Sequence, residues 1–176
     1  MSWVTTWGST VEERALAYPC DRQVAGADAT LFRAVDVNAP APLVYRWLCQ
    51  LRVAPYSYDL LDNFGRRSPR TRDPANEALA VGARMMRIFR LVELEPDRHL
   101  TMVIDRTRSF GEVAVTYQVT PAGNGERCRI VAKLCVRYGG RSLMRLVLPL
   151  GDLIMMRKQL LTLKQLAERE HRQSLA

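Results

Sequence analysis

The sequence predicts an α+β domain in which one long C-terminal helix lies across the concave face of a curved antiparallel sheet. Two patterns carry this prediction. Apolar and polar residues alternate through much of residues 81–138, as in strands, and apolar residues recur at helical spacing through Ser142–Glu170. A strongly twisted sheet of six to seven strands curls, and only the C-terminal helix is long enough to fill its concave side.

The composition is that of an ordinary globular protein. The chain has 176 residues, of which 48% are hydrophobic and 25% are charged, which suits a single domain with one core. Its first ten residues lack the basic start and the apolar run of a signal peptide. The apolar part of the last helix is shorter than the ~20 residues of a membrane span. We therefore expect a cytoplasmic protein without a transmembrane segment, either a monomer or a homodimer.

The net charge of +8 comes almost wholly from arginine, since only three of the 26 basic residues are lysines. Abundant arginine and alanine are typical of a GC-rich genome, and scattered positive charge aids solubility before it makes a binding site. Nucleic acid is therefore not the favoured partner. A basic loop at residues 66–72, RRSPRTR, leaves contact with phosphates of nucleic acid or anionic lipid as a third hypothesis.

The N-terminal third is predicted to contain an arm, a strand and a helix. Residues 1–30 are an arm packed on the domain, with a short helix that begins after Thr10 as N-cap. The domain spans residues 31–170, and residues 171–176 form a frayed tail. Leu31–Val37 is a half-buried strand, and Pro42–Gln50 has helical spacing with proline in its first turn.

A second short helix and a series of strands follow. Ser57 is placed to cap a helix at Tyr58–Asn63. Strands are predicted at Val81–Leu94 (one long strand or two joined by a bend), His99–Asp105, Glu112–Thr120 and Cys128–Tyr138. Tight turns join these strands, so the sheet is expected to be an antiparallel meander.

The C-terminal helix changes character along its length. From Leu143 to Met156 apolar residues cover nearly its whole circumference and leave only Arg145 and Asp152 on a polar strip. This pattern predicts burial on most sides, with Asp152 paired to Arg145 or Arg157. Pro149 predicts a kink or a fresh helix start.

Four segments carry a resemblance to a known family: NAPAPLVYRWL after the first strand, RVAPYSYDLLDNFGRRSPR, LAVGARM entering the sheet, and LGDLIMMRKQLLTLKQLAE in the last helix. In their order and residues they resemble the START-like superfamily, also called SRPBCC or helix-grip proteins, and most of all its bacterial polyketide cyclase/dehydrase and lipid-transport-like branch. The likeness covers Leu31–Arg169. It implies a sheet with two short helices after the first strand, and a cavity between the sheet and the last helix.

The leading hypothesis is an intracellular binding protein for a small hydrophobic ligand, such as a lipid, an isoprenoid, a sterol-like compound or a polyketide. Methionine is flexible and suits a pocket that adapts to an irregular ligand, although it equally fills gaps in a solid core. The residues expected to line the cavity are Tyr56, Tyr58, Met86, Met102, Tyr117, Met144, Leu148 and Met155.

The alternative is a cyclase or dehydratase that uses the same cavity. Its acid, base or orienting group would be Asp59, Arg84 or Asp105, and at least one of these must face the cavity. Asp59 could equally pair with a nearby loop arginine at the surface.

Cofactors and metals are not expected. The chain has two histidines, His99 and His171, which disfavours a metal site or a Ser-His-Asp triad. It has no phosphate-binding glycine loop for NAD, flavin or ATP. Its four cysteines lack CxxC spacing and are expected to be reduced and mostly buried.

Overall fold

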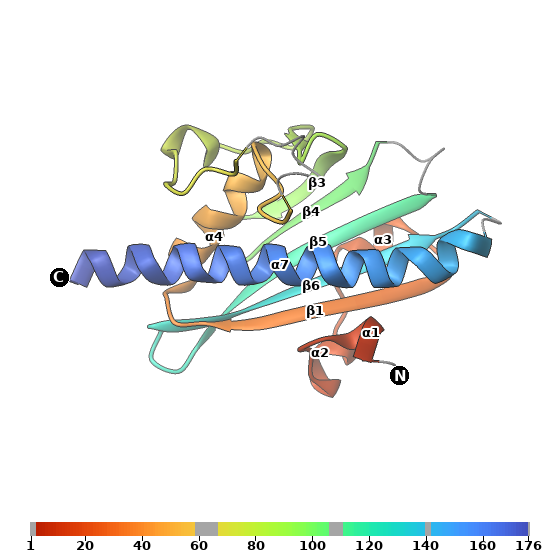
Figure 1. The fold of residues 1–176 in the computed structure, drawn as a ribbon, viewed down its shortest axis with the longest axis horizontal. Helices are drawn as coiled ribbons and strands as arrows, with labels where there is room; N and C mark the ends of the chain where they lie inside the picture. Colours follow the sequence, from red (N-terminus) through yellow and green to blue (C-terminus); the bar gives the residue numbers. More distant parts are fainter. Residues whose placement is uncertain (1–2, 59–66, 106–110, 140–141, 176) are drawn as a thin grey trace.

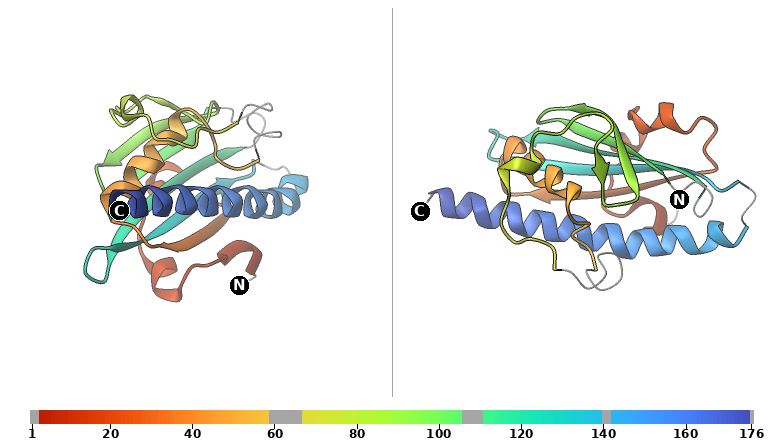
Figure 2. Two further views of the ribbon diagram at one scale, coloured as in Figure 1. Left: turned by 60° about the vertical axis from the view of Figure 1, so that its left-hand side comes forward. Right: turned by 90° about the horizontal axis from the view of Figure 1, so that it is seen from above.

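The structure is a computed structural model that describes residues 3–58, 67–105, 111–139 and 142–175. A six-stranded antiparallel sheet forms its centre, and the long helix α7 (Ser142–Leu175) lies across one face of it (Figure 1). Seen from above, the short helix α3 (Cys20–Gln23) and α7 lie on opposite sides of the sheet (Figure 2). The predicted α+β helix-grip arrangement is therefore confirmed.

The sheet has the order β1-β6-β5-β4-β3-β2, with every neighbouring pair antiparallel. Strands β2 to β6 form the predicted meander, whereas β1 pairs with the last strand. In Val81–Leu94 the alternative with a bend is correct, because Met86 and Arg87 turn the chain with φ of 44° and 64°. The strand bounds are β1 Ala29–Val37, β2 Arg84–Met85, β3 Phe89–Glu95, β4 His99–Ile104, β5 Glu112–Ala122 and β6 Arg127–Arg137.

Short helices close one end of the sheet. Helix α4 (Ala41–Cys49) has Pro42 in its first turn and continues into the 3-10 helix η1 (Gln50–Arg52), while a second 3-10 helix, η2, covers Pro74–Asn76. The helix predicted at Tyr58–Asn63 lies, apart from Tyr58, outside the described residues. Helix α7 continues through Pro149 without the predicted fresh start.

The N-terminal segment folds as three short helices, α1 (Trp3–Thr6), α2 (Val11–Ala15) and α3 (Cys20–Gln23). Thr10 caps α2 as predicted. Its hydroxyl accepts a hydrogen bond from the Glu13 backbone N–H (3.2 Å), and the Glu13 carboxylate accepts one from the Thr10 N–H (2.8 Å). This reciprocal pair satisfies two backbone donors at the start of the helix.

A second, smaller core lies on the convex face of the sheet, under α3. Tyr18, Cys20 and Val24 pack there against the outward side chains of Phe32, Ala34, Ala114, Val131 and Cys135. Asp21 forms an ion pair of 2.7 Å with Lys133 of β6, which fixes the segment on the sheet. All four cysteines are free and buried, as expected.

The main core lies between the concave face and helices α4 and α7. The second half of α7 is well buried, with Leu160, Leu163 and Ala167 at most 1% exposed. Its first half is not: Val147, Leu150, Ile154 and Met155 are 37–54% exposed. The prediction of burial on most sides is therefore wrong, because α7 is an outer layer that contacts the sheet with one side only.

Candidate functional site

A buried polar pair lies in the middle of the main core. Gln159 of α7 is 3% exposed and faces β5. Its Oε1 accepts a hydrogen bond from the Tyr117 hydroxyl at 2.6 Å, and its Nε2 donates to the Pro55 carbonyl at 2.6 Å. Buried polar groups need such partners, because an unpaired one loses its hydration without compensation. The amide thus joins the helix, the sheet and the chain after η1.

Two methionines complete the surroundings of this pair. The Met86 sulfur lies 3.3 Å from Gln159 Nε2, and the Met156 sulfur lies 3.3 Å from the Tyr117 hydroxyl oxygen. A thioether is a weak acceptor on a flexible chain of single bonds. An oxygen atom in place of the Met86 sulfur would be a better acceptor for the Gln159 N–H, and the methionines have the freedom to make room for it.

Two bulky residues beside Gln159 adopt left-handed backbone conformations. Tyr56 has φ of 56° and directly follows Pro55, and Met86 has φ of 44°. Such conformations are uncommon for bulky residues and cost on the order of 1–3 kcal/mol each. They persist where the surroundings enforce them, and they cluster at functional sites. Gln159 contacts both segments.

An ion pair lies closer to the start of α7. Arg33 of β1 is completely buried, and its Nη2 lies 2.7 Å from Oδ2 of Asp152, whose side chain is 9% exposed. The guanidinium also donates to the Phe32 carbonyl (2.7 Å) and the Pro149 carbonyl (3.3 Å). Within the described part of the chain, Arg33 Nε has no acceptor. Asp152 therefore pairs with neither Arg145 nor Arg157, contrary to expectation.

Burial in the interior raises the pKa of two groups, Asp152 of this pair and Tyr117 on β5. Burial raises the pKa of the Asp152 carboxyl to about 6, against the opposing charge of Arg33. Burial, and then the Asp152 charge, raise the pKa of the Tyr117 phenol. Tyr117 therefore remains a neutral hydrogen-bond donor, while Asp152 can exchange a proton close to neutral pH.

We expect Asp152 to make the protein less stable as the pH rises from about 4 to 7. A folded-state pKa of about 6, above the unfolded value of about 3.9, means that the folded chain binds the Asp152 proton more tightly than the unfolded chain. The resulting stabilisation, about 3 kcal/mol, is complete below about pH 4 and is lost as the pH rises through 6. Urea unfolding of the wild type and of Asp152→Asn, compared at each pH, measures it. If the wild type instead became more stable relative to Asp152→Asn as the pH rises, the attraction to Arg33 would outweigh burial in setting the pKa of Asp152.

The residues predicted to line a cavity are divided between the interior and the surface. Tyr56, Met102 and Tyr117 lie in the main core, and Met86 and Leu148 pack against it. Tyr58 and Met155 are 41% and 37% exposed, so neither contributes to the interior in this structure. The Met144 side chain lies outside the described residues. A ligand-binding role for each of them stays a prediction.

Two of the three candidate catalytic residues, Arg84 and Asp105, do not lie beside the buried Gln159–Tyr117 pair. Arg84 is exposed on the edge strand β2. Asp105 is exposed and pairs with Arg90 Nε at 3.2 Å. Asp59 lies outside the described residues. The catalytic role of these residues stays a prediction, and the structure adds Asp152 as a buried carboxyl.

Sequence reasoning missed Arg33 and Gln159, although a signal existed for each. In β1 the alternation places Arg33 on the same face as Leu31 and Val35, which are core residues. Gln159 falls on the helical stripe that contains Met156 and Leu163. A polar residue at an apolar position is the observation that marks both.

One cluster of possible metal ligands occurs in the described ranges. The ligand atoms of Cys20, Asp21 and Cys135 lie within 4.8 Å of one another on the convex face. The Lys133 ammonium already lies 2.7 Å from the Asp21 carboxylate. A cation in that position opposes a second positive charge, so this cluster fits a metal poorly.

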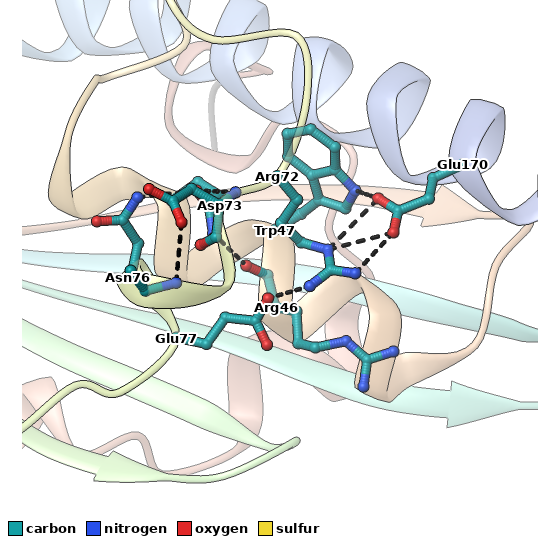
Figure 3. Close-up of polar contacts among 9 residues, drawn as sticks. Arg46, Trp47, Arg72, Asp73, Asn76, Glu77 and Glu170 are labelled. Atoms are coloured by element: carbon teal, nitrogen blue, oxygen red, sulfur yellow. Dashed lines mark hydrogen bonds and ion pairs between the residues drawn. The ribbon is translucent and has the colours of Figure 1, made fainter.

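The basic loop is partly neutralised by ion pairs. Figure 3 shows Arg72 between Glu77 and Glu170, with its Nη2 2.7 Å from the Glu170 carboxylate. The Trp47 indole donates to the same carboxylate at 2.9 Å. The Gln50 amide exchanges two hydrogen bonds with the Asp73 backbone. This network fixes the loop on α4 and α7 and engages one of the arginines considered for phosphate binding.

The comparisons with known proteins show the fold. No family model matches the chain, and no curated protein is significantly similar to it. Among solved structures, a Mesorhizobium loti protein is 17% identical with a TM-score of 0.51 and covers 80% of this chain and 98% of its own. Norcoclaurine synthase from Thalictrum flavum is 12% identical with a TM-score of 0.53, covering 78% and 85%. The di-domain ARO/CYC BexL from the BE-7585A biosynthetic pathway is 18% identical with a TM-score of 0.53, covering 80% of this chain and 46% of BexL.

Proposed function

We propose that this helix-grip protein binds a small, mostly apolar molecule that carries at least one oxygen, between the concave face of the sheet and α7. The observation that carries the proposal is the Gln159–Tyr117 pair, a polar contact of 2.6 Å within a core of aliphatic and aromatic side chains. Burying two polar groups there gains little stability over apolar residues of the same shape. A recognition role accounts for their presence.

The surroundings of the pair support an exchange of partners. Gln159 Nε2 has one strong acceptor, the Pro55 carbonyl, and one weak acceptor, the Met86 sulfur. A carbonyl or hydroxyl oxygen of the ligand would replace the sulfur at a gain, while the apolar remainder occupies space that Met86 and Met156 vacate.

The Arg33 Nε would supply a second polar contact, since it has no acceptor among the described residues. An enol, phenol or carboxylate would suit this donor. Lipids, isoprenoids, sterol-like compounds and polyketides all combine an apolar body with oxygen atoms of this kind. Two neighbours of the same fold are named for small-molecule biosynthesis, norcoclaurine synthase and BexL, which agrees with this class of ligand.

We expect Gln159→Leu and Tyr117→Phe each to weaken binding of dansyl-labelled undecanoic acid about tenfold. Gln159→Leu removes the N–H that the ligand oxygen accepts from, and Tyr117→Phe removes the hydroxyl that holds the Gln159 amide in position. Fluorescence titration measures the affinity, and mass spectrometry of a solvent extract identifies what the purified protein carries. Thr162→Val is the matched control, because Thr162 is also buried on α7 but, among the described residues, its hydroxyl donates within its own helix, to the Lys158 carbonyl.

Two results would reject the proposal. One is an empty extract together with no binding of the dansyl probe. The other is binding that Gln159→Leu and Tyr117→Phe leave unchanged but that Ile154→Glu abolishes, since Ile154 lies on the outer side of α7. Circular dichroism confirms that each variant is folded.

A further inference from the structure

The outer side of α7 carries a row of exposed apolar residues that the proposed ligand site does not use. Val147, Leu150 and Ile154 are 54%, 53% and 49% exposed, and their spacing of three and four residues places them on one stripe. Figure 1 views this side, with α7 in front of the sheet. Contiguous exposed apolar surface of this kind marks an interaction site.

A groove of about 320 Å³ runs along this stripe. Trp3 of α1 and Tyr58 border it, and they are 59% and 41% exposed. The rest of its lining comes from α7: Leu150, Leu153, Ile154, Arg157, Lys158 and Leu161. Tryptophan and tyrosine beside an aliphatic stripe are the residue types enriched where a protein meets the boundary between lipid and water.

The charges of the groove all have one sign. Arg157 and Lys158 belong to its lining, and its described lining includes no aspartate or glutamate. The Arg157 guanidinium is held 5.5 Å from the centre of the Trp7 ring, at the side of the stripe. The whole chain carries a net charge of +8. The surface therefore combines an apolar centre with a cationic border, which is complementary to anionic lipid.

We propose that the outer face of α7 docks on the surface of an anionic lipid bilayer. Leu150 and Ile154 enter the headgroup region, while Arg157 and Lys158 contact lipid phosphates. In the described ranges no helix has the length and hydrophobicity to cross a bilayer, so α7 lies on the surface. A second copy of the chain fits less well, because two such faces would bring the Arg157 and Lys158 side chains of both copies together.

Vesicle co-sedimentation tests this docking. We expect the protein to sediment with vesicles of phosphatidylcholine and phosphatidylglycerol, to do so far less with phosphatidylcholine alone, and to be released by salt, which screens the attraction. Ile154→Glu should lower the partition coefficient about tenfold or more, since it places an acid at the apolar centre. Lys158→Glu should remove most of the preference for phosphatidylglycerol without touching the apolar stripe.

Val81→Glu is the matched control, because Val81 is 64% exposed but lies outside the groove. It should sediment like the wild type. Failure of the wild type to sediment with either vesicle overturns the proposal, and so does equal loss in the Val81→Glu control. A dimer in analytical ultracentrifugation that Ile154→Glu converts to a monomer, without vesicle binding, overturns it in favour of a second copy. The interior site is tested separately, since Gln159→Leu should leave sedimentation unchanged.

Discussion

Replacing Arg33 with leucine is expected to lower the free energy of unfolding at neutral pH by about 3–5 kcal/mol, the usual cost of removing one partner of a buried ion pair. Arg33 is fully buried and lies 2.7 Å from Asp152, whose side chain is 9% exposed. Without the guanidinium, the Asp152 carboxyl is left in the interior with no compensating charge, so it must either stay ionised there or take up a proton, and either costs stability. The Pro149 carbonyl loses a donor as well.

Urea unfolding followed by circular dichroism measures this effect. The double variant Arg33→Leu with Asp152→Leu should recover much of the loss, because it leaves no unpaired charge. Arg22→Leu is the control: Arg22 pairs with Glu93 at a similar distance of 2.8 Å but is 67% exposed, and exposed pairs contribute at most about 1 kcal/mol. Equal costs for Arg33→Leu and Arg22→Leu would contradict the buried pair.

Truncation of Trp47 should be similarly costly. Trp47 is 1% exposed, contacts Tyr56 edge to face at 6.2 Å, and donates its indole N–H to Glu170. Trp47→Ala leaves a cavity between α4 and α7, for which about 3–5 kcal/mol is typical. The Glu170 carboxylate, which pairs with Arg72, also loses the hydrogen bond from the indole.

Trp47→Phe separates the two contributions. It keeps most of the buried ring and loses the hydrogen bond to a charged acceptor, which is expected to cost about 1.5–3 kcal/mol. Trp3→Ala is the control, since Trp3 is 59% exposed and such surface changes stay within about 0.5 kcal/mol. Thermal unfolding ranks the three variants. A Trp47→Ala variant as stable as Trp3→Ala would show that the indole does not support the packing of α4 on α7.

Local features of this fold were predictable from the sequence. The strand predicted at Glu112–Thr120 is β5, Glu112–Ala122, because alternation follows directly from the pleat of a strand. The Thr10 cap was also predictable, because the donor and the acceptor of the capping hydrogen bond lie three residues apart in the sequence. Such patterns need no knowledge of distant parts of the chain.

The features that failed depend on which elements meet. The apolar residues around the first half of α7 favour burial of that half. They do not indicate that only one side of the helix contacts the sheet. The true partner of Asp152 lies on β1, whereas the expected Arg145 and Arg157 lie on its own helix. β1 pairs with β6 at the far end of the chain. Single-sequence patterns contain no information on that pairing.

The N-terminal segment has a practical consequence for anyone who shortens this chain. Tyr18, Cys20 and Val24 shield part of the convex face of the sheet from water, because they pack on Phe32, Ala34 and Val131. A version of the chain that begins at β1 would expose these apolar side chains on the convex face and would tend to self-associate. The Cys135 thiol, 1% exposed beneath the same cover, would then react with alkylating reagents, so its labelling rate reports whether the segment is seated.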